Sequence, residues 1–186
     1  VAKKINHFIL NNYANPSSEH SLGKKARKQI DDSRKQIAKV INARPEEIIF
    51  TSGATESNNL AIRGILKATG KNHIITSTIE HPSVLDTCKS LQKEGVKIDY
   101  IEVDKEGIIN LEELESKITK DAALVSIMHV NNEIGTIQPI EKIAKLCESR
   151  EIYFHTDAVQ SFNKVSIDVK KVPIDLLSAS GHKIGA

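Results

Sequence analysis

The stretch HIITSTIEHPSVLDTCKSLQKEGVKIDYIEV, residues 73–103, decides the fold class. Residues 73–77 are rich in β-branched side chains and predict a short strand. Residues 82–95 predict a helix, because Pro82 suits a first helical turn and Gly95 suits the position just after the last turn. Residues 96–103 predict a second strand. A strand, a helix and a strand in this order form a βαβ unit, in which the two strands run parallel.

The same alternation extends on both sides of this unit. Hydrophobic periodicity and turn residues predict helices at 21–42, 52–70, 110–118 and 139–150, and strands at 46–51, 122–130, 152–158 and 174–179. Strands that alternate with helices of about 10 to 15 residues are typical of a parallel sheet that is covered on both faces. The sequence therefore predicts an α/β fold, a three-layer αβα domain with a mostly parallel sheet.

Composition is typical of a soluble globular protein. Hydrophobic residues make up 39% and charged residues 27% of the 186 residues, and this length fits one domain. No apolar run approaches the roughly 20 residues that cross a bilayer, so we expect no membrane partner. The first ten residues, VAKKINHFIL, hold no long apolar segment of a signal peptide, and we expect a cytoplasmic protein.

The net charge of +2 is unevenly distributed, because the chain up to Arg44 holds ten Lys and Arg but three Asp and Glu. This basic segment could attract an acidic partner or a nucleic acid. It has no interleaved aromatic residues and has the pattern of a helix with a solvated face. We therefore expect no direct binding of nucleic acid.

The two cysteines, Cys88 and Cys147, lie far apart and in no metal-like spacing. Both fall in predicted helices. This position favours buried thiols over a disulfide or a nucleophile.

Polar side chains follow every predicted strand. The carboxyl ends of parallel strands meet at one edge of the sheet, where ligands bind in such folds. We therefore expect these loops to form a common site. The loops are SGATES at 52–57, EHP at 80–82, NNEIG at 131–135, DAVQS at 157–161 and SGHK at 180–183.

Each loop allows an ordinary interpretation beside a functional one. The helix start after Gly53 could bind a phosphate or be a capped turn, and it is neither a Walker A loop nor GxGxxG. His81 could cap a helix or lie over a flat ligand. Asp157 would be costly to bury without a positive partner, but could also be a solvated turn residue. Lys183, in SASGHK at 178–183, could be a surface charge or a buried nucleophilic amine.

Three further sets of residues each allow more than one role. Asn131 and Asn132 could form a turn, the commoner role of paired asparagines. Gln160 could reach the site of Asp157 or lie on the surface. His155 and Asp157 share one face of a strand and could bind a metal, as in a metallohydrolase, although no other metal-ligand spacing is present.

Taken together, these loops resemble the motifs of a known family. FTSGATESNNLAIRG at 50–64, EHPSVLD at 80–86, MHVNNEIGTIQPI at 128–140, HTDAVQS at 155–161 and SASGHKIGA at 178–186 are similar, in order and approximate spacing, to those of cysteine desulfurases. This is a branch of the class V aminotransferases. The upstream segment NPSSEHSLGKKA at 15–26 is also similar. The resemblance covers nearly the whole chain and implies the type I fold that binds pyridoxal 5′-phosphate (PLP).

The resemblance implies a role for each of the strand-end residues. Lys183 matches the family's Schiff-base lysine, and Asp157 matches the residue that pairs with the pyridinium and so gains a positive partner. His81 matches the histidine that stacks on the ring and assists in proton transfer. The residues around the phosphate would be Ala54, Thr55, Ser180 and His182, and those around the ring hydroxyl and the substrate would be Gln160 and Asn132. We expect no metal.

The activity implied by the resemblance is PLP-dependent desulfuration of L-cysteine. The products would be L-alanine and a persulfide on a cysteine of the enzyme, with Lys183 moving the α-proton as base and acid. The implied partners are a second copy in a homodimer and a sulfur acceptor, either an iron–sulfur scaffold or a tRNA-thiolating enzyme. Selenocysteine lyase, another class V PLP enzyme and a non-catalytic piece of the fold stay open as alternatives.

The sequence departs from the family pattern at both ends. A first strand with a motif like DNAATT is absent, and three residues follow Lys183. We therefore expect residues 1–186 to be a partial PLP-binding large domain, without the family's N-terminal strand and C-terminal small domain. Neither Cys88 nor Cys147 matches the persulfide-forming cysteine, so we expect this chain alone to be inactive as a desulfurase.

Overall fold

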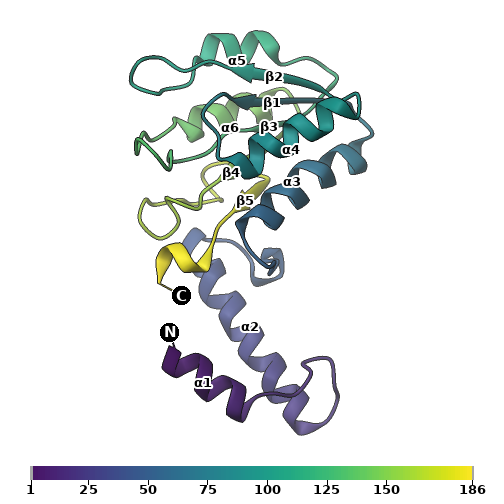
Figure 1. Ribbon diagram of the computed structural model, residues 1–186, viewed down its shortest axis with the longest axis vertical. Helices are drawn as coiled ribbons and strands as arrows, with labels where there is room; N and C mark the ends of the chain where they lie inside the picture. Colours follow the sequence, from purple (N-terminus) through teal and green to yellow (C-terminus); the bar gives the residue numbers. More distant parts are fainter. Residues whose placement is uncertain (1, 186) are drawn as a thin grey trace.

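A computed structural model describes residues 2–185, and its centre is a sheet of five parallel strands (Figure 1). The strands are β1 His73–Ser77, β2 Lys97–Ile101, β3 Ala122–Ser126, β4 Tyr153–Asp157 and β5 Leu176–Ser178. Their order in space is β2-β1-β3-β4-β5. β2 therefore lies on one side of β1, whereas β3, β4 and β5 follow on the other. The switch point of this topology, where ligands bind in open α/β sheets, lies between β1 and β3.

Four helices cover the two faces of the sheet: α3 Ala54–Thr69, α4 Pro82–Lys93, α5 Leu111–Lys117 and α6 Ile140–Ser149. Ile74 and Leu124 point to the face that α3 and α4 cover. Their neighbours Ile75 and Val125 point to the opposite face, where α5 and α6 pack, because side chains alternate along a strand. The predicted three-layer α/β fold with a parallel sheet is confirmed.

Two further helices, α1 Ala2–Asn11 and α2 Ser21–Ile41, precede these layers. Figure 1 shows them extending away from the sheet. α2 begins where the His20 ring accepts a hydrogen bond from the Gly23 N–H, and it ends at Asn42 in the left-handed conformation, with φ 60°. No residue of α1 is buried. Among residues 2–185, no helix is both long and apolar enough to cross a bilayer.

The prediction of a strand at 46–51 is wrong. Pro45–Glu47 forms a short 3₁₀ helix, and residues 48–51 have no ladder partner in the described chain. A strand needs partners for its N–H and C=O groups, and apolar, β-branched side chains do not provide them. Ile49 and Phe50 are accordingly 71% and 48% exposed. The other predicted strands are present, although those at 96–103, 122–130 and 174–179 are shortened to β2, β3 and β5.

The packing of the sheet against α6 can be tested at β4. Phe154 has no exposed surface there, so we expect Phe154→Ala to lower the free energy of unfolding by about 3 to 5 kcal/mol through lost burial and a cavity. Tyr153→Ala is the matched control, because Tyr153 is the adjacent residue and is 43% exposed. Its loss should be about 1 kcal/mol or less. Urea unfolding measures both, and equal losses would contradict this packing.

Candidate active site

A chain of hydrogen bonds joins the carboxyl ends of β1 and β4 through α3. Asp157, the last residue of β4, accepts a hydrogen bond on Oδ2 from Nδ2 of Asn58, at 2.7 Å. The same Nδ2 donates to Oγ of Ser83, at 2.8 Å. Ser83 Oγ in turn contacts Nδ1 of His81, at 2.8 Å. The structure thus connects two predicted site residues, Asp157 and His81, through two side chains that the sequence analysis did not select.

Asp157 is a buried carboxylate that contacts only neutral donors within residues 2–185. The residue is 4% exposed. Besides Asn58, its partner is the backbone N–H of Val159, which donates to Oδ1 at 2.9 Å. A carboxylate has about four acceptor positions, so it can accept further hydrogen bonds here. Because burying a charge is costly unless an opposite charge accompanies it, the site favours a cationic donor such as a protonated ring nitrogen.

The hydrogen bonds of His81 select one tautomer of its ring. Its Nδ1 accepts a hydrogen bond from the backbone N–H of Ser83, at 3.1 Å, at the start of α4. A backbone N–H only donates, so in the neutral ring Nδ1 is unprotonated and the proton lies on Nε2. Since His81 is exposed, the ring can cap the helix and still present its Nε2–H to a ligand. The two interpretations of His81 from the sequence are therefore compatible.

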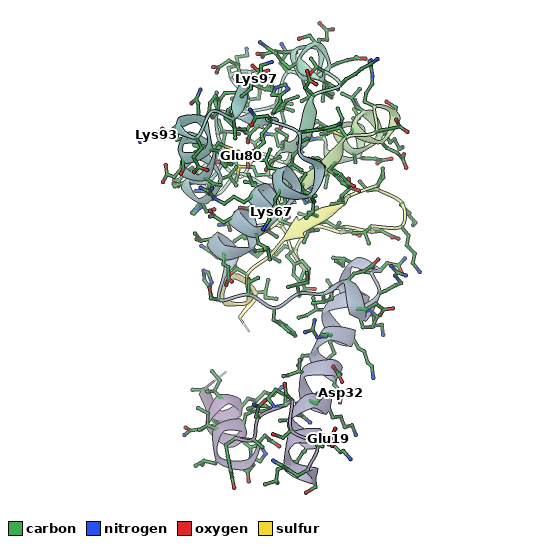
Figure 2. The ribbon with its side chains drawn as sticks, turned by 90° about the vertical axis from the view of Figure 1, so that its right-hand side faces the viewer. Glu19, Asp32, Lys67, Glu80, Lys93 and Lys97 are labelled. Atoms are coloured by element: carbon green, nitrogen blue, oxygen red, sulfur yellow. The ribbon has the colours of Figure 1, made fainter. Side chains whose placement is uncertain are left out.

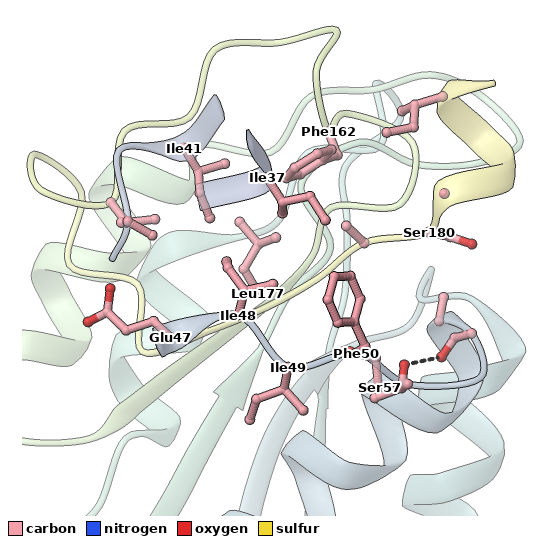
Figure 3. Close-up of a pocket in the computed structure, with 18 of the residues that line it drawn as sticks. Ile37, Ile41, Glu47, Ile48, Ile49, Phe50, Ser57, Phe162, Leu177 and Ser180 are labelled. Carbon is pink, nitrogen blue, oxygen red and sulfur yellow. Dashed lines mark hydrogen bonds between the residues drawn. The ribbon is translucent and has the colours of Figure 1, made fainter. Parts of the chain in front are cut away.

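The start of α3 and the loop after β5 line a common cavity of about 850 Å³ (Figure 3). Three of the predicted phosphate residues, Ala54, Ser180 and His182, are part of its wall. The first N–H groups of α3, at Ala54 and Thr55, have no acceptor within the helix and lie at the positive end of its dipole. Ser180 Oγ contacts Nδ1 of His182 at 2.7 Å. This part of the wall suits an anion such as a phosphate, whereas most of the remaining wall is apolar.

Lys183 lies in the 3₁₀ helix Gly181–Ile184, which follows β5, and its side chain is exposed. The structure places it at the predicted edge of the sheet, because Asp157 pairs with Ser178 in the register of β4 and β5. The loop that carries Lys183 therefore leaves the sheet beside Asp157. Its exposure leaves the amine accessible from solvent, and its role as the cofactor's amine stays a prediction.

Asn132 and Gln160 also lie at this edge, outside the hydrogen bonds described above. Asn132 is half-buried and its Nδ2 donates to Oε1 of Glu133, at 2.6 Å. Gln160 is half-buried in the loop after β4. The turn-forming role falls to Asn131, whose Oδ1 accepts hydrogen bonds from the backbone N–H groups of residues 133 and 134. The roles of Asn132 and Gln160 stay predictions.

His155 belongs to a second buried chain of hydrogen bonds. Its Nδ1 contacts Oγ of Ser126 at 2.8 Å, and its Nε2 contacts Oγ of Ser178 at 3.0 Å. Ser178 Oγ also contacts Oγ of Ser57, at 2.9 Å. Burial lowers the pKa of His155 to about 4, so the ring is neutral at pH 7.

The metal alternative is not supported. Serines occupy both ring nitrogens of His155, and Asp157 accepts its hydrogen bonds from other groups. In the described part of the chain, no three or more His, Cys, Asp or Glu residues are arranged to hold a metal ion.

Cys88 and Cys147 are buried free thiols, in α4 and α6 as the sequence predicts. Burial raises the pKa of each thiol to about 12. Because the thiolate is the reactive form, neither residue supplies a nucleophile near pH 7.

The sequence analysis missed Asn58, Ser83 and Glu80. All three are buried, with exposed fractions of 0%, 8% and 4%. Asn58 could have been found from its position, because it lies one helical turn before Ile62, a core residue on the same face of α3. A polar residue on the buried face of a helix indicates a specific hydrogen-bond partner.

Comparisons with known proteins identify the family of the chain. Residues 1–186 match the family described as class-V aminotransferases. The chain is 57% identical over 178 residues to cysteine desulfurase IscS of Ehrlichia chaffeensis, and the match covers 94% of this chain and 43% of that protein. It is 51% identical over 180 residues to cysteine desulfurase of Homo sapiens, covering 95% of this chain and 39% of the human one. A solved structure titled "SspA in complex with cysteine" superposes with a TM-score of 0.95 at 44% identity, over 98% of this chain and 53% of that one.

The chain therefore belongs to the class-V aminotransferase family, as the resemblance in its sequence predicted, and its relatives named above include cysteine desulfurases. Enzymes of this family depend on PLP. The chain spans less than half the length of the two curated relatives.

The pH dependence of stability tests the buried chain at His155. The pKa of His155 is about 4 in the folded chain and about 6.5 in an unfolded one, so the unfolded state takes up the proton first. The free energy of unfolding should therefore fall as the pH drops from about 6.5 to about 4. We expect His155→Gln to remove the pH-dependent part of the free energy of unfolding that comes from His155. The urea midpoints of the variant and the wild type should therefore converge as the pH falls. His7→Gln, at an exposed histidine, is the control and should keep the wild-type slope. An unchanged slope in His155→Gln would contradict this assignment.

Proposed function

We propose that this chain carries the cofactor-binding site of a PLP-dependent cysteine desulfurase. In this reaction L-cysteine and an enzyme thiol give L-alanine and an enzyme persulfide. The observation that supports the proposal most directly is the buried carboxylate of Asp157, which contacts only neutral donors and is joined through Asn58 and Ser83 to His81. Such a carboxylate would keep a proton on a pyridine nitrogen, as a PLP enzyme requires.

The chain's residues would hold the cofactor at both ends. Asp157 would accept the hydrogen bond of the ring nitrogen, and the His81 ring would lie on the ring face. PLP, when bound, withdraws electrons from the bonds of the substrate's α-carbon. Its phosphate would be bound by the start of α3 and the loop after β5, where Ala54, Ser180 and His182 line the cavity and Thr55 follows Ala54. Gln160 and Asn132, which do not line that cavity, would lie near the ring hydroxyl and the substrate.

Two side chains would handle the protons. The amine of Lys183 would hold the cofactor before the substrate arrives and, once released, move the α-proton as base and acid. The Nε2–H of His81 is the ring atom that can donate a proton, because Nδ1 is occupied by Ser83. The thiol that receives the sulfur is neither Cys88 nor Cys147, since both are buried with pKa values of about 12.

We also propose the partners and the location that the family resemblance implied. They are a homodimer, and a sulfur acceptor that is either an iron–sulfur scaffold or a tRNA-thiolating enzyme. The name IscS of the bacterial relative supports a role in iron–sulfur assembly. A cytoplasmic location stays a prediction.

Mapping the cofactor's attachment point tests the role of Lys183. The chain is incubated with PLP, treated with borohydride to fix the cofactor on its amine, digested and analysed by mass spectrometry. We expect the label on Lys183 and its loss in Lys183→Ala. A label confined to exposed lysines of α2, such as Lys24 or Lys28, in both proteins would refute this role.

The role of Asp157 is tested by Asp157→Asn. The substitution removes the charge that pairs with a protonated ring nitrogen, and a charged hydrogen bond contributes roughly 1.5 to 3 kcal/mol. We expect PLP affinity, measured by fluorescence titration, to fall roughly tenfold or more. Asp121→Asn, at an exposed carboxylate before β3, is the control and should bind as wild type does. Equal affinities in all three proteins would exclude Asp157 from the site.

A further inference from the structure

Glu80 is a buried carboxyl group at the switch point of the sheet. Its Oε1 accepts hydrogen bonds from Oγ of Ser77, at 2.6 Å, and from the backbone N–H of Met128, at 2.9 Å. Ser77 is the last residue of β1, and Met128 lies just after β3. The residue is 4% exposed, and Figure 2 shows it within the body of the molecule. One carboxyl group therefore connects the two strand ends between which the topology reverses.

The other oxygen of Glu80, Oε2, is buried and has no hydrogen-bond partner among the described residues. No cation compensates the group: within residues 2–185, its hydrogen bonds come only from a hydroxyl and a backbone amide. The ionisable groups that act on it or respond to it are Asp157 on β4 and the thiol of Cys88 on α4. The neighbouring ring of His81 bonds to Ser83 instead.

The side chain of His129, the residue after Met128, also does not bond to Glu80, since its Nδ1 contacts Oγ of Ser161 at 2.9 Å.

Burial, together with the charge of Asp157, raises the pKa of Glu80 to about 8. An ionised Glu80 would place a second uncompensated negative charge in the interior that already holds Asp157.

We propose that Glu80, in its protonated form, is a positioning residue of this site. It holds the loop that presents His81 to the ligand. Because it is uncharged, it leaves Asp157 as the one buried carboxylate charge beside the ring nitrogen. This inference extends the proposed function to a residue that does not touch the ligand. Glu80 precedes His81 directly, so fixing its carboxyl group to β1 and β3 fixes the start of α4 and the ring that caps it.

The protonation state can be measured without cofactor, by infrared spectroscopy of the C=O stretch of a protonated carboxyl group. We expect this band near pH 7 in wild type and in Glu106→Gln, which changes an exposed carboxylate. It should be lost in Glu80→Gln, and it should disappear from wild type as the pH rises through about 8. A wild-type spectrum that matches Glu80→Gln near pH 7 would overturn the proposal.

Stability gives an independent measurement of the same proton. The folded chain holds it to about pH 8, whereas an unfolded glutamate loses it near pH 4.5, so the folded state binds more protons in between. The urea midpoint of wild type should therefore fall relative to Glu80→Gln as the pH rises across this window. Glu106→Gln should keep the wild-type trend. A difference between wild type and Glu80→Gln that does not change with pH would contradict a protonated Glu80.

The positioning role is read from the ring resonances of His81 in NMR spectra, assigned with His81→Asn. Glu80→Gln keeps an oxygen that accepts from Ser77 and Met128 and should leave these resonances in place. Glu80→Ala loses both contacts and should shift or broaden them. If Glu80→Ala leaves the His81 resonances unchanged, or if Glu80→Gln disturbs them as strongly as Glu80→Ala, the proposal is wrong. None of these measurements depends on PLP, so they separate a failure of this inference from a failure of cofactor binding at Lys183.

Discussion

The site is organised around one buried negative charge, the carboxylate of Asp157. Its only partners in the described chain are neutral, Nδ2 of Asn58 and the N–H of Val159, so its position fixes α3 through Asn58 and the start of α4 through Ser83. The helices α3 and α4 are thereby oriented towards a charge that no group within residues 2–185 neutralises. If the proposed cofactor binds here, these hydrogen-bond dipoles are in place before it arrives, which is electrostatic preorganisation.

The parallel sheet explains why residues so distant in sequence share this edge. Each helix returns the chain to the amino end of the next strand, so every carboxyl end faces the same side. The loop after β1 therefore approaches the loops after β4 and β5, although about 80 to 100 positions of the chain separate it from them. The same geometry brings two acidic side chains, Glu80 and Asp157, close enough that the charge of Asp157 adds to burial in raising the pKa of Glu80.

Periodicity and turn residues were sufficient to predict the layers, the parallel strands and the loops at the carboxyl ends of those strands, because these depend on local pattern. The strand expected at 46–51 failed because strand formation also requires a neighbour, and pattern does not reveal whether one is present. Asn58, Ser83 and Glu80 were missed for a related reason. Each acts through a hydrogen bond to a residue outside its own segment, at Asp157, Asn58 and Met128 respectively, and a single sequence does not show such pairs.

The burial of both thiols has a practical consequence for experiments on this chain. Cys88 and Cys147 lie on opposite sides of the sheet, each within a core cluster. We expect them to resist maleimides and disulfide reagents, because burial both hides the thiols and disfavours the thiolate. A cysteine introduced at any exposed position would therefore react far faster than either native thiol. The molecule can therefore be labelled at two introduced cysteines, one on α2 and one at the sheet, without prior removal of its own cysteines, and the distance between the two labels can be measured in the unaltered core.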